Sequence, residues 1–119
     1  MSVLFAAVVA CIAANTFIAV ADYAGAGFVL ENSAAVRTPA RALPYLATLK
    51  LAGAAGLVVG LAAAPWLGVA AGAGLTLFFV GAVAAHVRAR VFHNIAFPGV
   101  YLLLALASAA YMTDAALGG

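Results

Sequence analysis

Charged residues are scarce in this chain of 119 residues, since Asp, Glu, Lys and Arg together make up only 7% of it. A soluble globular domain carries about 25% charged residues. Hydrophobic residues instead reach 69%, and three acidic side chains stand beside five basic ones. The composition therefore excludes an ordinary soluble enzyme and predicts an integral membrane protein.

Cysteine and clustered basic residues are lacking as well. The one cysteine, Cys11, lies within an apolar run, so neither a disulfide framework nor a thiolate metal cluster is available within the chain. The five basic residues are dispersed rather than gathered in a stripe, which argues against nucleic acid as a partner. His86 and His93 share no rigid helical face and no haem motif accompanies them. These patterns predict no metal site and no cofactor.

Long apolar runs fill most of the chain. Val3 to Ala21 contains 19 residues without a charge, and a membrane-spanning helix needs about 20. Three prolines punctuate the runs that follow, at positions 44, 65 and 98. The sequence thus predicts a single all-α membrane domain over residues 1–119, a four-helix transmembrane bundle with short loops. The predicted helices occupy about 3–28, 45–63, 67–87 and 98–112, with an interfacial loop at about 29–44 in which Asn32 and Ser33 are candidate N-cap residues for a short helix.

Basic residues near the loops set the predicted orientation, because Lys and Arg favour the cytoplasmic side of a membrane. None of them lies at the second connection, Pro65-Trp66. The basic residues that flank the first and third connections are Arg37, Arg41, Lys50, Arg88 and Arg90. We therefore predict that these two loops face the cytoplasm and that both chain ends lie outside (N-out, C-out). Arg88 and Arg90 are predicted to contact anionic lipid headgroups.

Ionisable side chains within the predicted helices are candidates for function, because a charge inside a membrane is unfavourable unless it is paired, faces the bundle interior or reaches water. Asp22, Lys50 and His86 are such residues, and all three are predicted in the cytoplasmic half. Asn15 precedes Asp22 by seven residues and so shares nearly the same helical face, which predicts a polar track towards the midplane. These four residues are the candidate ligand-binding residues, and Asp22, Lys50 and His86 are the candidate catalytic residues.

Two interpretations of the charged residues stay open. The similar depth of Asp22 and Lys50 predicts an ion pair, which either holds the first two helices together or serves a ligand or a proton. His86 either carries protons or forms a hydrogen bond with Asp22 or with a backbone carbonyl.

Small residues predict close packing between helices. The chain contains 34 alanines and 12 glycines. Gly56 and Gly60 are four residues apart, and so are Gly68 and Gly72. In a membrane such spacing lets two helix backbones approach closely.

Several strings resemble those of a known family of four-helix membrane proteins, the DoxX-like family. The resemblance is carried by LKLAGAAGL at 49–57, AAGAGL at 70–75 and GAVAAH at 81–86. Further strings resemble an actinobacterial-type subgroup, namely Asn15, ADY at 21–23, FVLEN at 28–32 and FPG at 97–99. The resemblance implies a multi-pass protein of the bacterial inner membrane. Because some relatives are linked to membrane oxidoreductase systems, including thiosulfate to quinone electron transfer, it also makes a quinone a possible ligand.

Two classes of function fit these observations. The first is a non-catalytic membrane component that binds lipid, quinone or another protein, as a homo-oligomer or within a larger membrane complex. The second is an acid-base enzyme, an isomerase or hydrolase of a lipophilic molecule, in which Asp22 or His86 transfers protons and Lys50 stabilises negative charge. A filled bundle with a tight contact between Asp22 and Lys50 favours the first, and an enclosed pocket where the three residues converge favours the second.

Overall fold

The computed structural model describes residues 2–118, which form helices joined by short connections, without a strand. Its elements are α1 (Val3–Ala24), α2 (Gly27–Ala35), the 3-10 helix η1 (Ala40–Ala42), α3 (Leu43–Ala62), α4 (Pro65–Arg88) and α5 (Ala96–Ala116). Ser2 caps the first helix, since its Oγ accepts a hydrogen bond from the N–H of Phe5 at 3.0 Å. The predicted all-α fold is confirmed.

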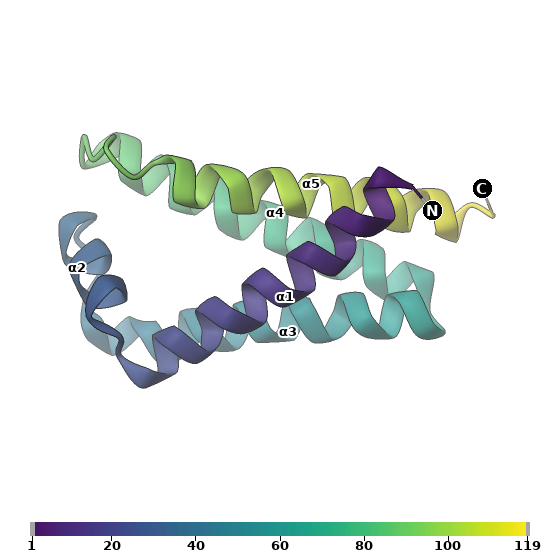
Figure 1. Ribbon diagram of the computed structural model, residues 1–119, viewed down its shortest axis with the longest axis horizontal. Coiled ribbons are helices and arrows are strands. Elements are labelled where there is room, and N and C mark those ends of the chain that lie inside the picture. The colour runs from purple at the N-terminus through teal and green to yellow at the C-terminus, as the bar shows by residue number, and fades with distance from the viewer. Residues whose placement is uncertain (1, 119) are drawn as a thin grey trace.

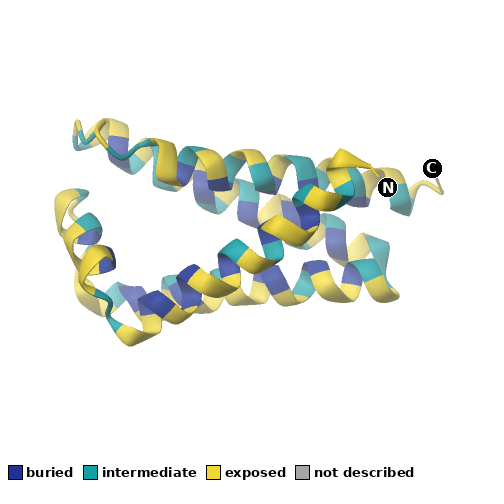
Figure 2. Cartoon of the chain, in the orientation of Figure 1, coloured by how far each residue is buried: buried dark blue, intermediate teal, exposed yellow. Residues whose placement is uncertain are grey.

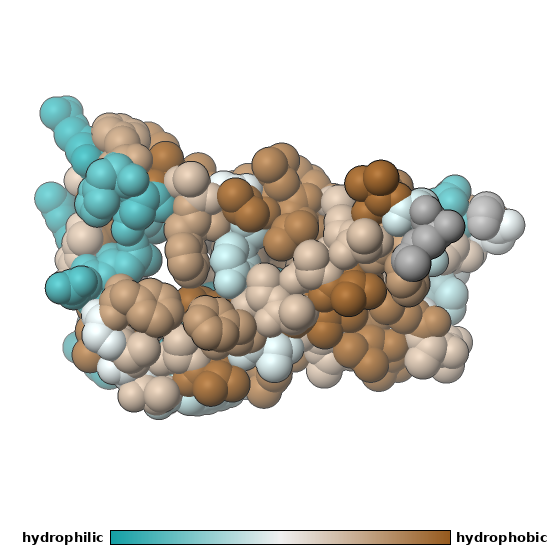
Figure 3. All heavy atoms as spheres, viewed as in Figure 1, coloured by the Kyte–Doolittle hydropathy of each residue, from teal (hydrophilic) through white to brown (hydrophobic). Residues whose placement is uncertain are grey.

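Four of the helices described are long and apolar enough to cross a membrane, namely α1, α3, α4 and α5. They contain 20 to 24 residues, which at about 1.5 Å per residue gives roughly 30–36 Å, against a hydrocarbon core of about 30 Å. Large apolar side chains cover their outer faces; Leu77 is 74% exposed and Leu103 is 66% exposed. Figure 3 shows hydrophobic residues over the middle of the face in view, with hydrophilic residues gathered at the end where α2 lies. This distribution suits a bundle surrounded by lipid.

The long helices run up and down in sequence (Figure 1). α1 packs against α3 and α5, and α4 packs against the same two helices. The two chain ends and the α3–α4 turn lie at one end of the bundle, while α2 and the α4–α5 connection lie at the other. This is the predicted layout of four crossings. The side of the membrane on which each end lies stays a prediction.

Glycines allow the helices to approach closely, as predicted. A Cβ built on Gly60 of α3 would lie 2.6 Å from the Cα of Gly68 in α4, which is closer than real Cβ atoms come. A Cβ on Gly72 would lie 2.9 Å from the backbone of Ala109 in α5. The core beside these contacts is apolar and includes the fully buried Leu57 and Met112. Figure 2 shows buried positions along all four long helices.

The first predicted helix and the loop after it need correction. The sequence predicts a helix to about residue 28, but α1 ends at Ala24 because Gly25 adopts the left-handed conformation, with φ 64°. The N–H groups of Gly25 and Ala26 then bond to the carbonyls of Asp22 and Ala21, which closes the helix end. Much of the predicted loop at 29–44 is helical instead, since α2 begins at Gly27.

α2 lies across one end of the bundle (Figure 1). Val29 and Ser33, one turn apart, are its buried residues, so one face of this short helix turns inward. Asn32 and Ser33 lie within the helix rather than at its start, so their predicted N-cap role is wrong. α2 therefore covers the end of the bundle where the candidate site lies.

Candidate functional site

A cavity of about 500 Å³ lies at the α2 end of the bundle. All five α-helices contribute to its wall, together with the segments that connect α2 to α3 and α4 to α5. Much of the wall is apolar and includes Ile18, Val29, Leu43, Leu46, Phe78 and Phe79. The polar wall residues on which the site depends are Asp22, Asn32, Lys50, His86 and Asn94.

Asp22 and Lys50 form the predicted ion pair. Lys50 Nζ lies 2.7 Å from Asp22 Oδ2; the side chain of Lys50 is 12% exposed and that of Asp22 is 2% exposed. Asp22 lies near the end of α1 and Lys50 in the first half of α3, so the antiparallel packing of these helices brings them to one depth. The ammonium group also lies 5.4 Å from the ring centroid of Phe78, a cation–π arrangement that further stabilises the charge. The pair joins α1 to α3 and at the same time lines the cavity.

His86 is buried on the α4 side of the cavity. Its Nδ1 lies 2.9 Å from the carbonyl oxygen of Ala82, to which it donates because that oxygen only accepts. Its Nε2 lies 3.2 Å from Oδ1 of Asn32 in α2. Of the two predicted partners the backbone carbonyl is therefore used, and no hydrogen bond to Asp22 occurs among residues 2–118.

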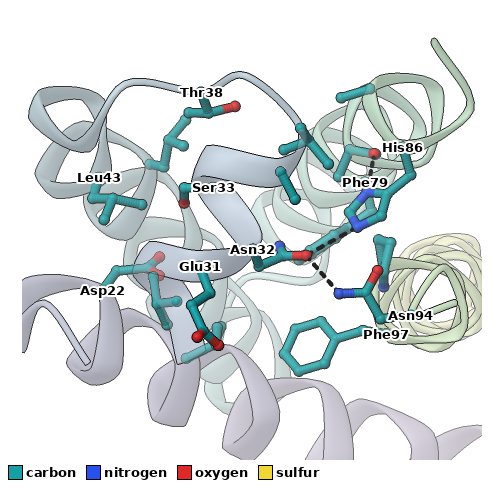
Figure 4. A pocket seen from close by; sticks show the side chains of 18 of the residues that line it. Asp22, Glu31, Asn32, Ser33, Thr38, Leu43, Phe79, His86, Asn94 and Phe97 are labelled. Atoms are coloured by element: carbon teal, nitrogen blue, oxygen red, sulfur yellow. Dashed lines mark hydrogen bonds between the residues drawn. The ribbon is translucent and has the colours of Figure 1, made fainter. Parts of the chain in front are cut away.

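Two asparagines complete this side of the site, and their role was not predicted from the sequence. Asn94, after α4, donates from Nδ2 to Oδ1 of Asn32 at 2.8 Å. Figure 4 shows Asn32 of α2 between His86 and Asn94, joined to both. A signal was present, since the chain has three asparagines and two of them flank predicted membrane segments. The contacts of Asn32 with His86 and Asn94 connect α2 to α4 and to the segment that follows α4.

Asn15 does not belong to the cavity wall described above. It is fully buried in α1, where Nδ2 donates to the carbonyl oxygen of Cys11 at 3.0 Å. Its Oδ1 has no hydrogen-bond partner among the described residues. The cavity reaches Ile18 and Asp22 of α1 but does not extend to Asn15. The predicted role of Asn15 in ligand binding stays a prediction.

Arg88 and Arg90 are exposed at the end of α4 and do not line the cavity. Arg90 adopts a positive φ of 59°, and so does Arg37 after α2, with φ 63°. These residues lie where the helices end, at the same end of the bundle as α2. Their predicted contact with lipid headgroups stays a prediction.

The arrangement presents two polar groups to one apolar cavity. One is the ion pair from α1 and α3, and the other is the hydrogen-bonded set of His86, Asn32 and Asn94. An apolar pocket with a few convergent polar groups is the usual form of a small-molecule site. Four apolar crossings around such a site define a multi-pass membrane protein.

The model of the DoxX-like family matches residues 6–108 of the chain. The protein belongs to this family. The match covers Asp22, Lys50 and His86 and ends within α5. No curated protein and no solved structure matches the chain significantly.

Proposed function

We propose that this DoxX-like protein is a non-catalytic membrane component that binds a lipophilic small molecule. The cavity at the α2 end carries the proposal, because it combines an apolar wall with the ion pair of Asp22 and Lys50. Its volume of about 500 Å³ falls within the roughly 300–1,000 Å³ of ligand pockets. A bacterial inner membrane is the proposed location, with lipid around the bundle.

A quinone is one ligand that suits this wall. Its flat ring would lie against Phe78 and Phe79, whose rings are 5.0 Å apart at their centroids and belong to the wall. Its carbonyl oxygens would accept hydrogen bonds from Lys50. A membrane lipid is the other ligand proposed, and the protein would then act as a subunit or scaffold of a larger membrane complex.

A membrane-embedded acid-base enzyme is the second candidate. It is favoured by one observation, that Asp22, Lys50 and His86 all line the same cavity. The tight contact between Asp22 and Lys50 favours the binding component instead, since the carboxylate and the ammonium group already serve each other as hydrogen-bond partners. Nδ1 of His86 is also engaged, since it donates to the carbonyl oxygen of Ala82.

Native mass spectrometry of the gently extracted protein tests the proposal. A bound molecule should appear as a mass beyond that of the chain. Ala85→Trp places an indole in the cavity wall and should abolish retention, while Ala84→Trp, exposed on the neighbouring face of α4, should leave it intact. Equal retention in the two variants, or no retained molecule in the wild type, would contradict the proposal. Chemical conversion of the retained molecule by the purified protein would establish the enzyme.

A further inference from the structure

We infer that the cavity selects an uncharged amphiphile, and that Asp22 determines this selectivity by neutralising Lys50. The inference deepens the proposed function and rests on it, because it names the class of ligand that the same cavity accepts.

The inner wall of the cavity carries one compensated charge pair. Lys50 Nζ is bonded to Asp22 Oδ2 at 2.7 Å, and the carboxylate side chain is only 2% exposed. Among the described residues the other ionisable side chains of the wall are Glu31, His86 and His93. Glu31 and His93 are exposed, so water screens both side chains and they contribute little inside the cavity. His86 is buried between Ala82 and Asn32, and in its neutral form, with a proton on Nδ1 alone, it adds no charge to the wall.

A charged head group entering the cavity would lose its hydration without gaining a free counter-charge. An anion would be attracted by Lys50 and repelled by Asp22 at nearly the same distance, because the two charges are in contact. The attraction and the repulsion largely cancel, whereas the free-energy cost of removing water from the ion remains. An uncharged head group pays a smaller desolvation penalty and is therefore favoured.

Lys50 still has hydrogen-bonding capacity for an uncharged head group. An ammonium group has three N–H donors, and its one hydrogen bond within residues 2–118 is the bond to Asp22. With 12% of its side chain exposed in the cavity wall, Lys50 is accessible to a ligand. A carbonyl, hydroxyl or ether oxygen would accept from one of the remaining donors. The wall thus favours an apolar molecule whose head carries an acceptor oxygen and no net charge.

Three probes with the same alkyl chain test the inference, namely dodecanol, dodecanoate and dodecylamine. Each is titrated into purified protein in a neutral detergent at about pH 8.5, where a carboxyl group is ionised and an alkylamine is protonated. Bound and free protein are quantified by native mass spectrometry. The wild type is expected to bind dodecanol more tightly than either charged probe.

Charge-neutralising variants provide the decisive comparison. Asp22→Asn leaves the lysine uncompensated and should move the preference towards dodecanoate by about tenfold or more, since charge-assisted hydrogen bonds are roughly twice as strong as neutral ones. Lys50→Gln leaves the carboxylate uncompensated and should move the preference towards dodecylamine. The double variant, Asp22→Asn with Lys50→Gln, is neutral again and should regain the preference for dodecanol. Ratios between probes for one variant are unaffected by partial loss of folded protein.

The matched control is Asp114→Asn, which removes the one other aspartate of the chain, exposed near the end of α5 and outside the cavity wall. It should bind the three probes as the wild type does. Binding of dodecanoate by the wild type as tightly as dodecanol, or an unchanged ratio in Asp22→Asn, would overturn the inference alone. Failure of all three probes to bind, together with the absence of any retained molecule after extraction, would overturn the proposed function as well.

Discussion

A buried carboxylate and a buried ammonium group are each unfavourable alone, and Asp22 and Lys50 share that penalty by direct contact. Removing one partner of such a pair costs about 3–5 kcal/mol because the other charge stays behind. Sequence position alone predicted the pair, since both residues interrupt apolar runs at matching depths. Sequence position did not predict the second polar group, because His86 and Asn32 lie far apart in the chain. In addition, Asn32 belongs to α2, which was predicted as a loop.

A single hydroxyl ties α5 to α1 across the interior. Tyr101 Oη donates to the carbonyl oxygen of Ala14 at 3.0 Å. Tyr101→Phe removes this bond and keeps the ring against Phe79 and Phe97, so we expect a loss of about 0.5–1.5 kcal/mol in unfolding free energy. Thermal unfolding in detergent, followed by circular dichroism, measures it.

Tyr111→Phe is the matched control for that variant. Tyr111 also lies in α5, and its ring packs against Phe5 with centroids 5.8 Å apart, but its hydroxyl forms no hydrogen bond among the described residues. The thermal unfolding midpoint of Tyr111→Phe should equal that of the wild type. A fall as large as that of Tyr101→Phe would show that the bond to Ala14 contributes nothing specific.

The bounds of α3, α4 and α5 lie within a few residues of the predicted ones, because prolines and polar residues punctuate the apolar runs there. α1 and α2 differ because the apolar residues after Gly25 resemble a continued span, whereas the left-handed conformation of that glycine ends the helix. A short amphipathic helix over a cavity becomes evident only once the other helices are placed.

Gly72 and Gly74 form a matched pair for testing how tightly α4 packs on α5. Gly72→Ala would place a methyl group 2.9 Å from the Ala109 backbone, so the helices must separate. We expect a loss of about 1–3 kcal/mol, as for overpacked cores. Gly74→Ala meets nothing within 4 Å and replaces a poor helix former, so its midpoint should be unchanged or raised. Thermal midpoints of the two variants in the same detergent decide the matter, and a stable Gly72→Ala would contradict the close contact.

At the scale of the whole molecule, the two ends of the bundle differ in chemistry. The α2 end carries Arg37, Arg41, Arg88 and Arg90 together with the cavity, whereas the opposite end holds the α3–α4 turn and both chain ends. Basic residues near short loops favour the cytoplasmic side. We therefore expect the cavity to lie in the cytoplasmic half of the membrane and its ligand to exchange with the inner leaflet.

Labelling of introduced cysteines in intact cells tests this orientation. Ala63→Cys places a thiol at the exposed α3–α4 turn, and Phe92→Cys places one in the exposed segment after α4, neither with a change of charge. A membrane-impermeant maleimide should label Ala63→Cys in intact cells and Phe92→Cys only after lysis. The wild type gives the background, because its one cysteine, Cys11, is fully buried. The opposite pattern would place the cavity in the outer half, and its ligand would then come from the outer leaflet.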